Sequence, residues 1–320
     1  MSTYLVTGAG GFIGSHLVRR LLADGHRVRG IDNFTTGRRS NLGGVDGLSL
    51  IEGDINDAAS IAKAIEGVDY VLHEAAIPSV PRSIDDPVAS HHANVSGTVS
   101  VLEAARRSGT VKRVVYAASS SAYGDAPTLP KVETMTPNPR SPYAADKLAG
   151  EYYCRVYANV FGLECVCLRY FNVFGPRQDP ASLYAAVIPR FITSMLARQS
   201  PPVHGDGRQS RDFTFIDNVV DANLAACTAP GASGEVINIA CGERIELLGV
   251  IREINRALGS AIKPEFLPSR AGDVRDSLAD IDKARRILDY APRVSVAQGL
   301  AQTIAWYRGE SLSADAASLP

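Results

Sequence analysis

The feature that most constrains the fold is a regular alternation of short apolar segments with amphipathic segments in the first half of the chain. The short segments are rich in β-branched residues, which is typical of strands, and they span residues 4–7, 27–31, 48–52, 70–74, 111–117 and 163–169. Helical patterns separate them at 13–22, 58–65, 94–108 and 143–161. Because helical crossovers join parallel strands, this order predicts an α/β fold with a Rossmann-type, doubly wound parallel sheet.

The regular pattern ends near residue 172, after which prolines interrupt shorter segments. We therefore expect a Rossmann domain over residues 1–172 and a smaller α/β C-terminal substrate lobe over 173–309. Later segments at about 212–240, which include the strand-like runs 211–216 and 236–240, are expected to cross back to the first domain. Small polar residues at 310–320 predict a disordered tail.

Charge and hydropathy exclude several classes of partner. The 320 residues contain 33 Lys and Arg against 34 Asp and Glu, a formal net charge of −1. Such a balance provides no overall field for nucleic acid or an acidic membrane, so an anionic ligand must be held locally. No apolar run approaches the roughly 18 residues of a spanning helix, and the N-terminus lacks a signal-peptide pattern. We expect a cytoplasmic protein that binds neither nucleic acid nor membrane.

The cysteines favour packing over chemistry. Their number is odd, and no CxxC pair or His at ligand spacing accompanies them: Cys154, Cys165, Cys167, Cys227 and Cys241. Cys165 and Cys167 fall on one face of a predicted strand. We expect no metal site and no disulfide.

A glycine-rich loop follows the first predicted strand and opens the first predicted helix. Its sequence is Thr7-Gly8-Ala9-Gly10-Gly11-Phe12-Ile13-Gly14. Glycines permit the tight turn and a close approach of backbone to pyrophosphate, while the helix N-terminus attracts the phosphates. The loop therefore predicts a dinucleotide site.

Asp32 lies about 20 residues beyond the loop, at the end of the second predicted strand, where a carboxylate binds ribose hydroxyls and repels a 2′-phosphate. This favours NAD over NADP, with Arg38 and Arg39 interpreted as solvated loop residues. Asp54-Ile55 and 75–77 follow the next two strands and are expected to line the same crevice.

Tyr143 and Lys147 are four residues apart at the start of a predicted helix, so both project from one face. A neighbouring ammonium favours the phenolate, which predicts a lowered pKa for Tyr143 and a role as general base. The hydroxyls of Ser119, Ser120 and Ser121 follow a predicted strand, where one of them can bind the same substrate oxygen.

Together these motifs resemble the extended short-chain dehydrogenase/reductases of the nucleotide-sugar epimerase/dehydratase kind. The resemblance also rests on His73-x-Ala75-Ala76 and on Arg169-Tyr-Phe-Asn172-Val-Phe-Gly175-Pro176, and it extends from Thr7 to about Trp306. It implies a tightly held NAD, reduced and reoxidised within one turnover. The cofactor contacts that it implies are Gly8, Gly11, Phe12, Ile13, Gly14, Asp32, Asn33, Thr36, Gly37, Asp54, Ile55, Ala75, Ala76, Ile77, Asn94, Tyr143, Lys147 and Phe171.

The resemblance also separates subfamilies. Sugar-nucleotide 4,6-dehydratases have an Asp-Glu pair where this chain has Ser120 and Ser121. Elimination of water then lacks its acid and base, so the chain is similar to a 4-epimerase, an isomerase. Tyr143 would take the proton of the sugar 4-hydroxyl, and the 4-keto sugar would turn and be reduced on its other face.

The substrate contacts follow from the same resemblance. Arg211 and Arg270 match positions that bind the UDP diphosphate, with fork-like donors that suit phosphate. The other contacts are expected at Ser79, Ser119, Tyr143, Asn172, Val187, His204, Asp273 and Ser277. His204 could equally be a solvated surface histidine.

Ser277 bears on the identity of the sugar, because glucose-preferring epimerases carry a bulky aromatic residue there. A small side chain leaves room for an N-acetyl group, and several segments resemble bacterial UDP-N-acetylglucosamine 4-epimerases of surface-polysaccharide pathways. The expected reaction is interconversion of UDP-GlcNAc and UDP-GalNAc, with UDP-Glc and UDP-Gal as further substrates.

Two other functions stay open. A UDP-glucuronate 4-epimerase or a related decarboxylase would need donors for the C6 carboxylate, for which Ser79, Arg82 and Arg177 are candidates. A non-catalytic NAD-binding regulator would share the fold, although such proteins usually lose the Tyr or the Lys. By analogy with the family we also expect a homodimer through the helices at 94–108 and 143–161.

Overall fold

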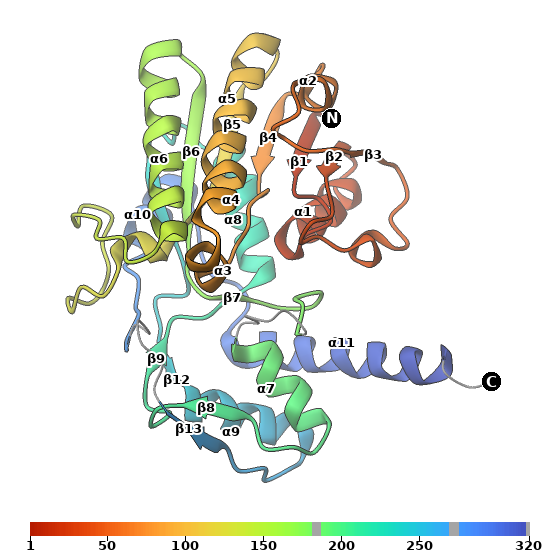
Figure 1. Cartoon of the computed structure of the whole chain (residues 1–320), viewed down its shortest axis with the longest axis vertical. Coiled ribbons are helices and arrows are strands. Elements are labelled where there is room, and N and C mark those ends of the chain that lie inside the picture. Colours follow the sequence, from red (N-terminus) through yellow and green to blue (C-terminus); the bar gives the residue numbers. More distant parts are fainter. Residues whose placement is uncertain (181–186, 269–274, 318–320) are drawn as a thin grey trace.

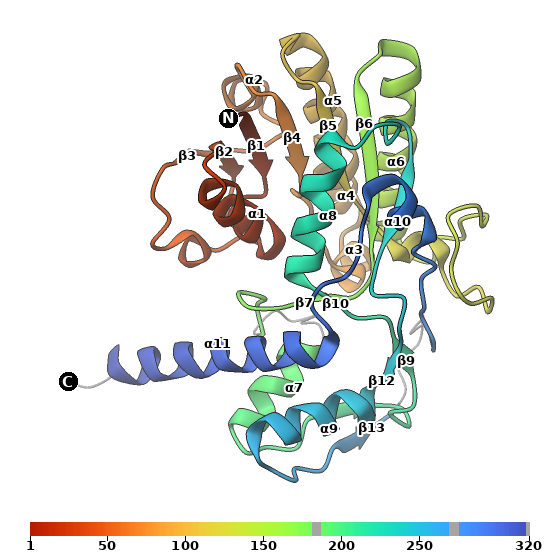
Figure 2. The same cartoon turned by 180° about the vertical axis from the view of Figure 1, so that it is seen from behind.

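A seven-stranded parallel sheet forms the centre of the molecule (Figures 1 and 2). The computed structural model describes residues 1–180, 187–268 and 275–317, with side chains to residue 309. The strand order is β11-β6-β5-β4-β1-β2-β3. The strands are β1 (Thr3–Thr7), β2 (Arg27–Asp32), β3 (Leu48–Glu52), β4 (Tyr70–His73), β5 (Arg113–Ser119), β6 (Glu164–Tyr170) and β11 (Val236–Ile239). This confirms the predicted doubly wound sheet: six of its strands lie close to the positions predicted in the regular half, and β11 matches the strand-like run 236–240.

Helices cover both faces of the sheet, because alternate strand residues point to opposite sides. One layer contains α2 (Ala58–Ile65), α5 (Gly97–Ser108) and α6 (Pro142–Phe161), in front in Figure 1. The other contains α1 (Phe12–Ala23) and α8 (Ile216–Thr228), in front in Figure 2. Leu5 and Val71 belong to the core on the first side, and Val6 and Leu72 to the core on the second.

Two short helices before α5 escape the sequence prediction. They are α3 (Val80–Asp85) and α4 (Pro87–His91), and a π-helical turn (His92–Ser96) joins them to α5. Ser79 and Asp86 begin them, each accepting a hydrogen bond from a backbone N–H three residues on. Proline near the start of each helix suits this cap. The expected helix at 94–108 is therefore the end of a longer helical segment.

The predicted strand at 211–216 is wrong. The segment divides into β9 (Ser210–Arg211), antiparallel to β12 (Ile245–Glu246), and β10 (Thr214–Phe215), parallel to β7 (Val173–Phe174). Between them Asp212 accepts hydrogen bonds from the backbone N–H groups of Cys241, Gly242 and Ala279. This buried carboxylate turns the chain from one strand pair to the other.

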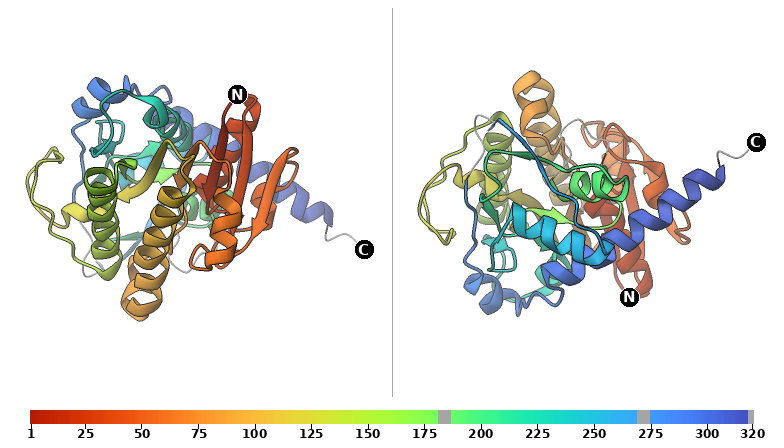
Figure 3. Two further views of the ribbon diagram at one scale, coloured as in Figure 1. Left: turned by 90° about the horizontal axis from the view of Figure 1, so that it is seen from above. Right: turned by 90° about the horizontal axis from the view of Figure 1, so that it is seen from below.

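The smaller lobe lies below the carboxyl ends of the sheet strands, as Figure 1 shows. It contains α7 (Val187–Leu196), α9 (Leu247–Leu258), β8 (Pro202–His204) and β13 (Glu265–Leu267), while α10 (Asp282–Leu288) returns to β11. α11 (Val296–Ala317) packs against α7 and α9 and then extends away from the body (Figure 3). Short 3-10 helices occur at Arg39–Leu42 and Ser120–Tyr123.

The backbone of α11 is helical to Ala317, and the expectation of a disordered tail from residue 310 stays a prediction. The segment contains several alanines, which have the highest helix propensity. Within the described ranges, no helix is long and apolar enough to cross a membrane.

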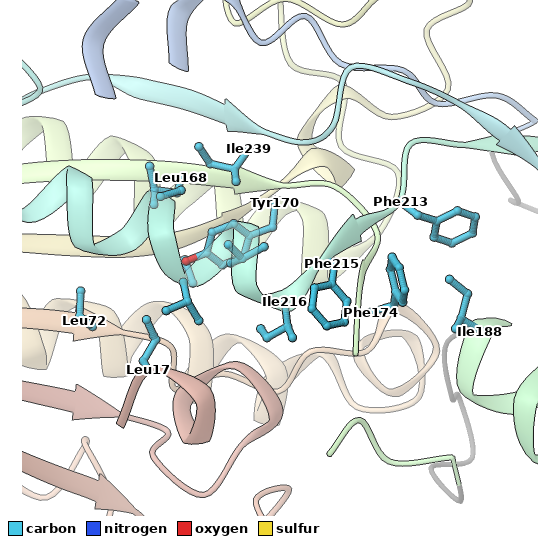
Figure 4. Close-up of a cluster of buried hydrophobic side chains, with 14 of the residues drawn as sticks. Leu17, Leu72, Leu168, Tyr170, Phe174, Ile188, Phe213, Phe215, Ile216 and Ile239 are labelled. Carbon is cyan, nitrogen blue, oxygen red and sulfur yellow. The ribbon is translucent and has the colours of Figure 1, made fainter. Parts of the chain in front are cut away.

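One continuous apolar cluster connects the sheet with the smaller lobe. Figure 4 shows it passing from Leu72 and Leu168 of the sheet through Phe174 and Phe215 to Ile188 of α7. The rings of Phe174 and Phe215 are 5.6 Å apart in an edge-on arrangement. The two lobes therefore share one apolar core.

The cysteines pack as expected. Cys154, Cys165, Cys167 and Cys227 are buried free thiols. Within the part of the chain that the structure describes, no three His, Cys, Asp or Glu side chains gather as metal ligands.

Candidate active site

The glycine loop between β1 and α1 has no room for larger residues. Gly8 has a φ of +67°, and a Cβ on it would lie 2.8 Å from the backbone nitrogen of Ala75. A Cβ on Gly14 would lie 2.1 Å from the carbonyl oxygen of Gly8. No side chain caps α1 and no acidic residue occupies its first turn, so its N-terminus suits an anionic group.

Asp32 is buried at the end of β2 and holds this loop. Its carboxylate accepts hydrogen bonds from the backbone N–H groups of Gly10 (2.8 Å) and Phe34 (2.7 Å), and a Cβ on Gly37 would meet it at 2.9 Å. Carboxylate oxygens keep further acceptor sites for a ribose.

Arg38 and Arg39, which follow this turn, both have acidic partners. Arg38 pairs with Asp179, and Arg39 lies 2.5 Å from Glu52 and 4.3 Å from the centre of the Phe34 ring. Each guanidinium is therefore already paired with a carboxylate, which disfavours binding of a 2′-phosphate at this turn.

A buried hydrogen-bond chain connects the ends of β1 and β4 to α5. Thr98 donates to the carbonyl oxygen of Asn94 (2.6 Å), so its oxygen accepts from Nε2 of His73 (3.0 Å). Nδ1 of His73 then accepts from the hydroxyl of Thr7 (2.7 Å). Burial lowers the pKa of His73 to about 3, assisted by the charge of Lys147, so the ring is neutral.

Several predicted cofactor residues form hydrogen bonds or packing contacts with other protein groups at this edge of the sheet. Asn94 is 1% exposed and accepts a hydrogen bond from the backbone N–H of Ile77 (2.8 Å). Asn33 donates to Asp54 (2.8 Å). Phe171 is fully buried against Tyr123. The side chains of Asn94 and Phe171 are thus both buried, and the contacts of these two residues with the cofactor stay a prediction.

The candidate catalytic side chains meet where β5 ends and α6 begins. Lys147 donates to the carbonyl oxygen of Ala117 (2.8 Å), and its Nζ lies 4.9 Å from the centre of the Tyr116 ring. Ser119 forms a hydrogen bond with Tyr143, and Ser121 donates to Ser119 from both its backbone N–H (3.2 Å) and its hydroxyl (2.9 Å). Ser119 is therefore the hydroxyl that reaches the phenol.

The acidity of Tyr143 differs from the expectation. Burial raises its pKa, which the hydrogen bond from Ser119 opposes and the charge of Glu74 reinforces. The predicted lowering is wrong for this structure, because desolvation of the phenolate outweighs the hydrogen bond with Ser119. Burial also lowers the pKa of Lys147 to about 8, against the attraction of Glu74.

Glu74 is the main residue that the sequence reasoning missed at this edge. Tyr170 donates to its Oε1 (2.8 Å), and burial raises its pKa to about 7. The signal was present, since Glu74 is the one acidic residue in an otherwise apolar strand end at 71–77.

A pocket in the smaller lobe gathers four of the predicted substrate residues from separate segments: Asn172, Val187, His204 and Arg211. Arg190 and Gln209 line it too and were not predicted. Nδ1 of His204 bonds with the carbonyl oxygen of Pro268 (3.0 Å). Among the described residues, the buried atoms Nε2 of His204 and Oε1 of Gln209 have no hydrogen-bond partner, which is unusual for buried polar atoms.

Ser277 lies beside this pocket. Asn172, at a φ of +36°, donates to its hydroxyl (3.1 Å) and to the carbonyl oxygen of Asp212 (2.9 Å). Ser79 caps α3, whereas Arg270 and Asp273 lie outside the described residues.

Known proteins are similar to this chain in sequence and in fold. The model of the "NAD dependent epimerase/dehydratase family" matches residues 4–240. A UDP-glucose 4-epimerase of Mycolicibacterium smegmatis is 42% identical over 96% of this chain and 99% of its own length. A Methanobrevibacter ruminantium UDP-N-acetylglucosamine 4-epimerase, solved with UDP-N-acetylmuramic acid, shares 37% identity at a TM-score of 0.92, covering 97% of this chain and 99% of that one. A Bacillus cereus UDP-glucuronic acid 4-epimerase, solved with UDP-glucuronic acid and NAD, shares 35% identity at a TM-score of 0.89, covering 96% and 99%.

Proposed function

Since this chain belongs to the NAD dependent epimerase/dehydratase family, we propose that it is a UDP-sugar 4-epimerase that interconverts UDP-GlcNAc and UDP-GalNAc. The observation that carries this proposal is the small Ser277, whose hydroxyl accepts a hydrogen bond from Asn172 of the pocket. We propose that this pocket holds the bulky sugar substituent while Ser119, Tyr143 and Lys147 at the sheet edge serve proton transfer.

The residues at the sheet edge fit NAD. A Cβ would fill the cradle at Gly8 and Gly14, the N-terminus of α1 accepts an anion, and Asp32 offers a carboxylate to a ribose. A bound NAD would supply the hydride acceptor, and then the hydride donor, that a change of configuration at sugar C4 requires.

Tyr143 and Ser119 handle the proton of the sugar 4-hydroxyl. Ser119 holds the hydroxyl oxygen and Tyr143 accepts the proton as C4 becomes a ketone, then returns it when C4 is reduced. Lys147, held by the carbonyl oxygen of Ala117, keeps a cation beside the phenolate. The cycle ends with no net redox change.

The choice of an N-acetylated sugar rests on volume. A hydroxymethyl side chain at Ser277 leaves space that an aromatic ring would fill, and overpacking costs about 1–3 kcal/mol. The UDP-N-acetylglucosamine 4-epimerase of Methanobrevibacter ruminantium supports this choice by its similarity.

Two sugars compete with this choice. Similarity to the UDP-glucose 4-epimerase of Mycolicibacterium smegmatis supports UDP-glucose as the substrate. Similarity to the UDP-glucuronic acid 4-epimerase of Bacillus cereus supports UDP-glucuronate. NMR of the protein incubated with UDP-GlcNAc, UDP-Glc and UDP-GlcA in parallel, without added cofactor, separates them. The proposal expects the highest kcat/KM with UDP-GlcNAc; selective turnover of UDP-GlcA would assign the chain to the glucuronate epimerases.

We also propose a homodimer through α6. Tyr152, Tyr153, Val156 and Val160 expose apolar surface along this helix, and Val160 is 67% exposed. Residues four apart share a helix face, so three of these side chains form a stripe. Light scattering after size exclusion should give twice the chain mass, and V156E/V160E should give the monomer.

A further inference from the structure

A carboxylate lies at the reactive edge of the sheet, and the proposed proton transfer does not use it. Glu74 directly follows β4, and the register that pairs His73 with Tyr116 brings Glu74 level with Ala117. Lys147 donates to the carbonyl oxygen of Ala117 (2.8 Å). The acid and the ammonium are thus both anchored at the ends of two neighbouring strands.

Hydrogen bonds from two further elements orient the Glu74 carboxylate. Asn223 of α8 donates to the hydroxyl oxygen of Tyr170 (2.8 Å), and Tyr170 of β6 in turn donates to Oε1 of Glu74 (2.8 Å). Tyr170 lies within the buried cluster of Figure 4. In this arrangement Oε1 of Glu74 accepts the hydroxyl hydrogen of Tyr170, which favours the ionised carboxylate against the effect of burial.

Charge connects Glu74 to both members of the catalytic pair. The carboxylate attracts the Lys147 ammonium and repels the Tyr143 phenolate. It therefore raises the pKa of both groups, which keeps Lys147 charged and makes Tyr143 a stronger base once ionised.

We propose that Glu74 is a positioning residue that tunes the Tyr143–Lys147 pair through its charge, held in place by the hydrogen bond from Tyr170. This inference rests on the proposed function for the role of Tyr143 as a base. It adds a third group, on a different strand, to the catalytic pair of α6.

Other groups face the pair from every side. From β4 comes neutral His73, and from β5 come Tyr116 and Ser119; Asp146, Glu151 and Cys154 lie on α6 itself. Asp146 accepts from Ser90 (2.7 Å), and Glu151 binds Arg169 through two hydrogen bonds. Of these carboxylates, Glu74 acts on both Tyr143 and Lys147.

The first test reads the phenol without any sugar. The ultraviolet absorbance of tyrosinate is followed against pH in the wild-type protein and in Y143F, and the difference reports Tyr143. The same difference is then taken between E74Q and E74Q/Y143F. Tyr143 should ionise at lower pH in E74Q, whereas an unchanged ionisation overturns the proposal.

A matched control is E66Q, which makes the same chemical change at an exposed position before the other end of β4. E66Q should leave the ionisation of Tyr143 at the wild-type pH. An equal shift of the Tyr143 ionisation in E66Q and E74Q would mean that the net charge of the protein, and not the position of Glu74, sets the pKa of Tyr143. This result would also overturn the proposal.

The second test is the pH profile of kcat/KM. E74Q should move both limbs to lower pH, because Tyr143 and Lys147 each lose their proton more easily. Y170F keeps Glu74 but removes its hydrogen bond, so both limbs should move to lower pH by a smaller amount. The double variant E74Q/Y170F should give the same pH profile as E74Q. A uniform loss of rate without a shift would indicate a merely structural role. If no UDP-sugar is turned over, the proposed function fails, and the absorbance titration still decides the role of Glu74.

Discussion

The proposed dinucleotide end and the proposed sugar end of the site are built differently. At the dinucleotide end, Asp32 accepts hydrogen bonds from two loop N–H groups, and both ring nitrogens of His73 bond with threonine hydroxyls, so protein groups hold both side chains in place. At the sugar end, Nε2 of His204 and Oε1 of Gln209 are buried with no hydrogen-bond partner among the described residues. Buried polar atoms normally find partners, so the described protein groups do not complete the hydrogen bonds at this end.

This difference indicates which changes each end tolerates. The dinucleotide end forms part of the fold, so damage there should reduce stability and cofactor content together. The sugar pocket draws on several separate segments, so single substitutions there should alter specificity while the sheet stays intact.

The largest effect is expected from Gly14→Ala. The added Cβ would lie 2.1 Å from the carbonyl oxygen of Gly8, so the loop or α1 must move. Bound NAD, measured after denaturation, and epimerase activity should both be lost, and Tm should fall. Gly309→Ala, where a Cβ meets nothing within 4 Å, is the control and should keep both. Retention of NAD by G14A would break the comparison.

Tyr143→Phe should remove the base and leave the dinucleotide end intact. The loss of kcat should be about 10²–10⁴-fold, the usual contribution of a positioned acid or base. Cofactor content should match the wild-type protein, because the glycine loop is untouched. Turnover near the wild-type rate would reject Tyr143 as the base.

Ser277→Tyr should change specificity at the sugar end alone. An aromatic ring beside Asn172 would occupy the space assigned to the N-acetyl group, at a cost of about 1–3 kcal/mol. The ratio of kcat/KM for UDP-GlcNAc to that for UDP-Glc should fall at least about fivefold. Ser277→Ala should preserve the ratio. An unchanged ratio in S277Y would place the sugar discrimination elsewhere.

The smallest effect concerns pH and the buried His73. Its pKa is about 3 in the folded chain against 6.5 for an unperturbed histidine. Between these two pKa values, His73 is protonated in the unfolded chain and neutral in the folded chain. The contribution of neutral His73 to the free energy of unfolding is therefore complete above pH 6.5 and is lost as the pH falls towards 3. Denaturant unfolding across this range should show a shallower pH dependence for His73→Gln. Identical slopes in both proteins would show that other groups dominate.

Much of the fold follows from local patterns. Period-two and period-3.6 hydrophobicity placed six sheet strands and the major helices, since each element buries one side against its neighbours. The strand at 211–216 failed because Asp212, through three backbone hydrogen bonds, turns the chain where apolar periodicity alone suggests continuity.

The candidate site was only partly visible in the sequence. Gly8, Gly14, Tyr143 and Lys147 have spacings that carry their own physical reason. Glu74 and Gln209 have no such spacing, because the residues that they bond with, Tyr170 and His204, lie more than four positions away in the chain. The acidity of Tyr143 was mispredicted, since desolvation depends on burial, which spacing does not reveal.

The sequence by itself determined the parallel α/β architecture, the glycine loop at the first helix and the pair of catalytic side chains one helical turn apart, because these are consequences of local backbone geometry and short periodicities. Only the tertiary structure decided that Tyr170 meets Glu74, that Asn172 meets Ser277 and that Val187 and Arg211 line one pocket. Those contacts join residues far apart in the chain, and the strand order and the packing of the two lobes bring them within hydrogen-bonding distance.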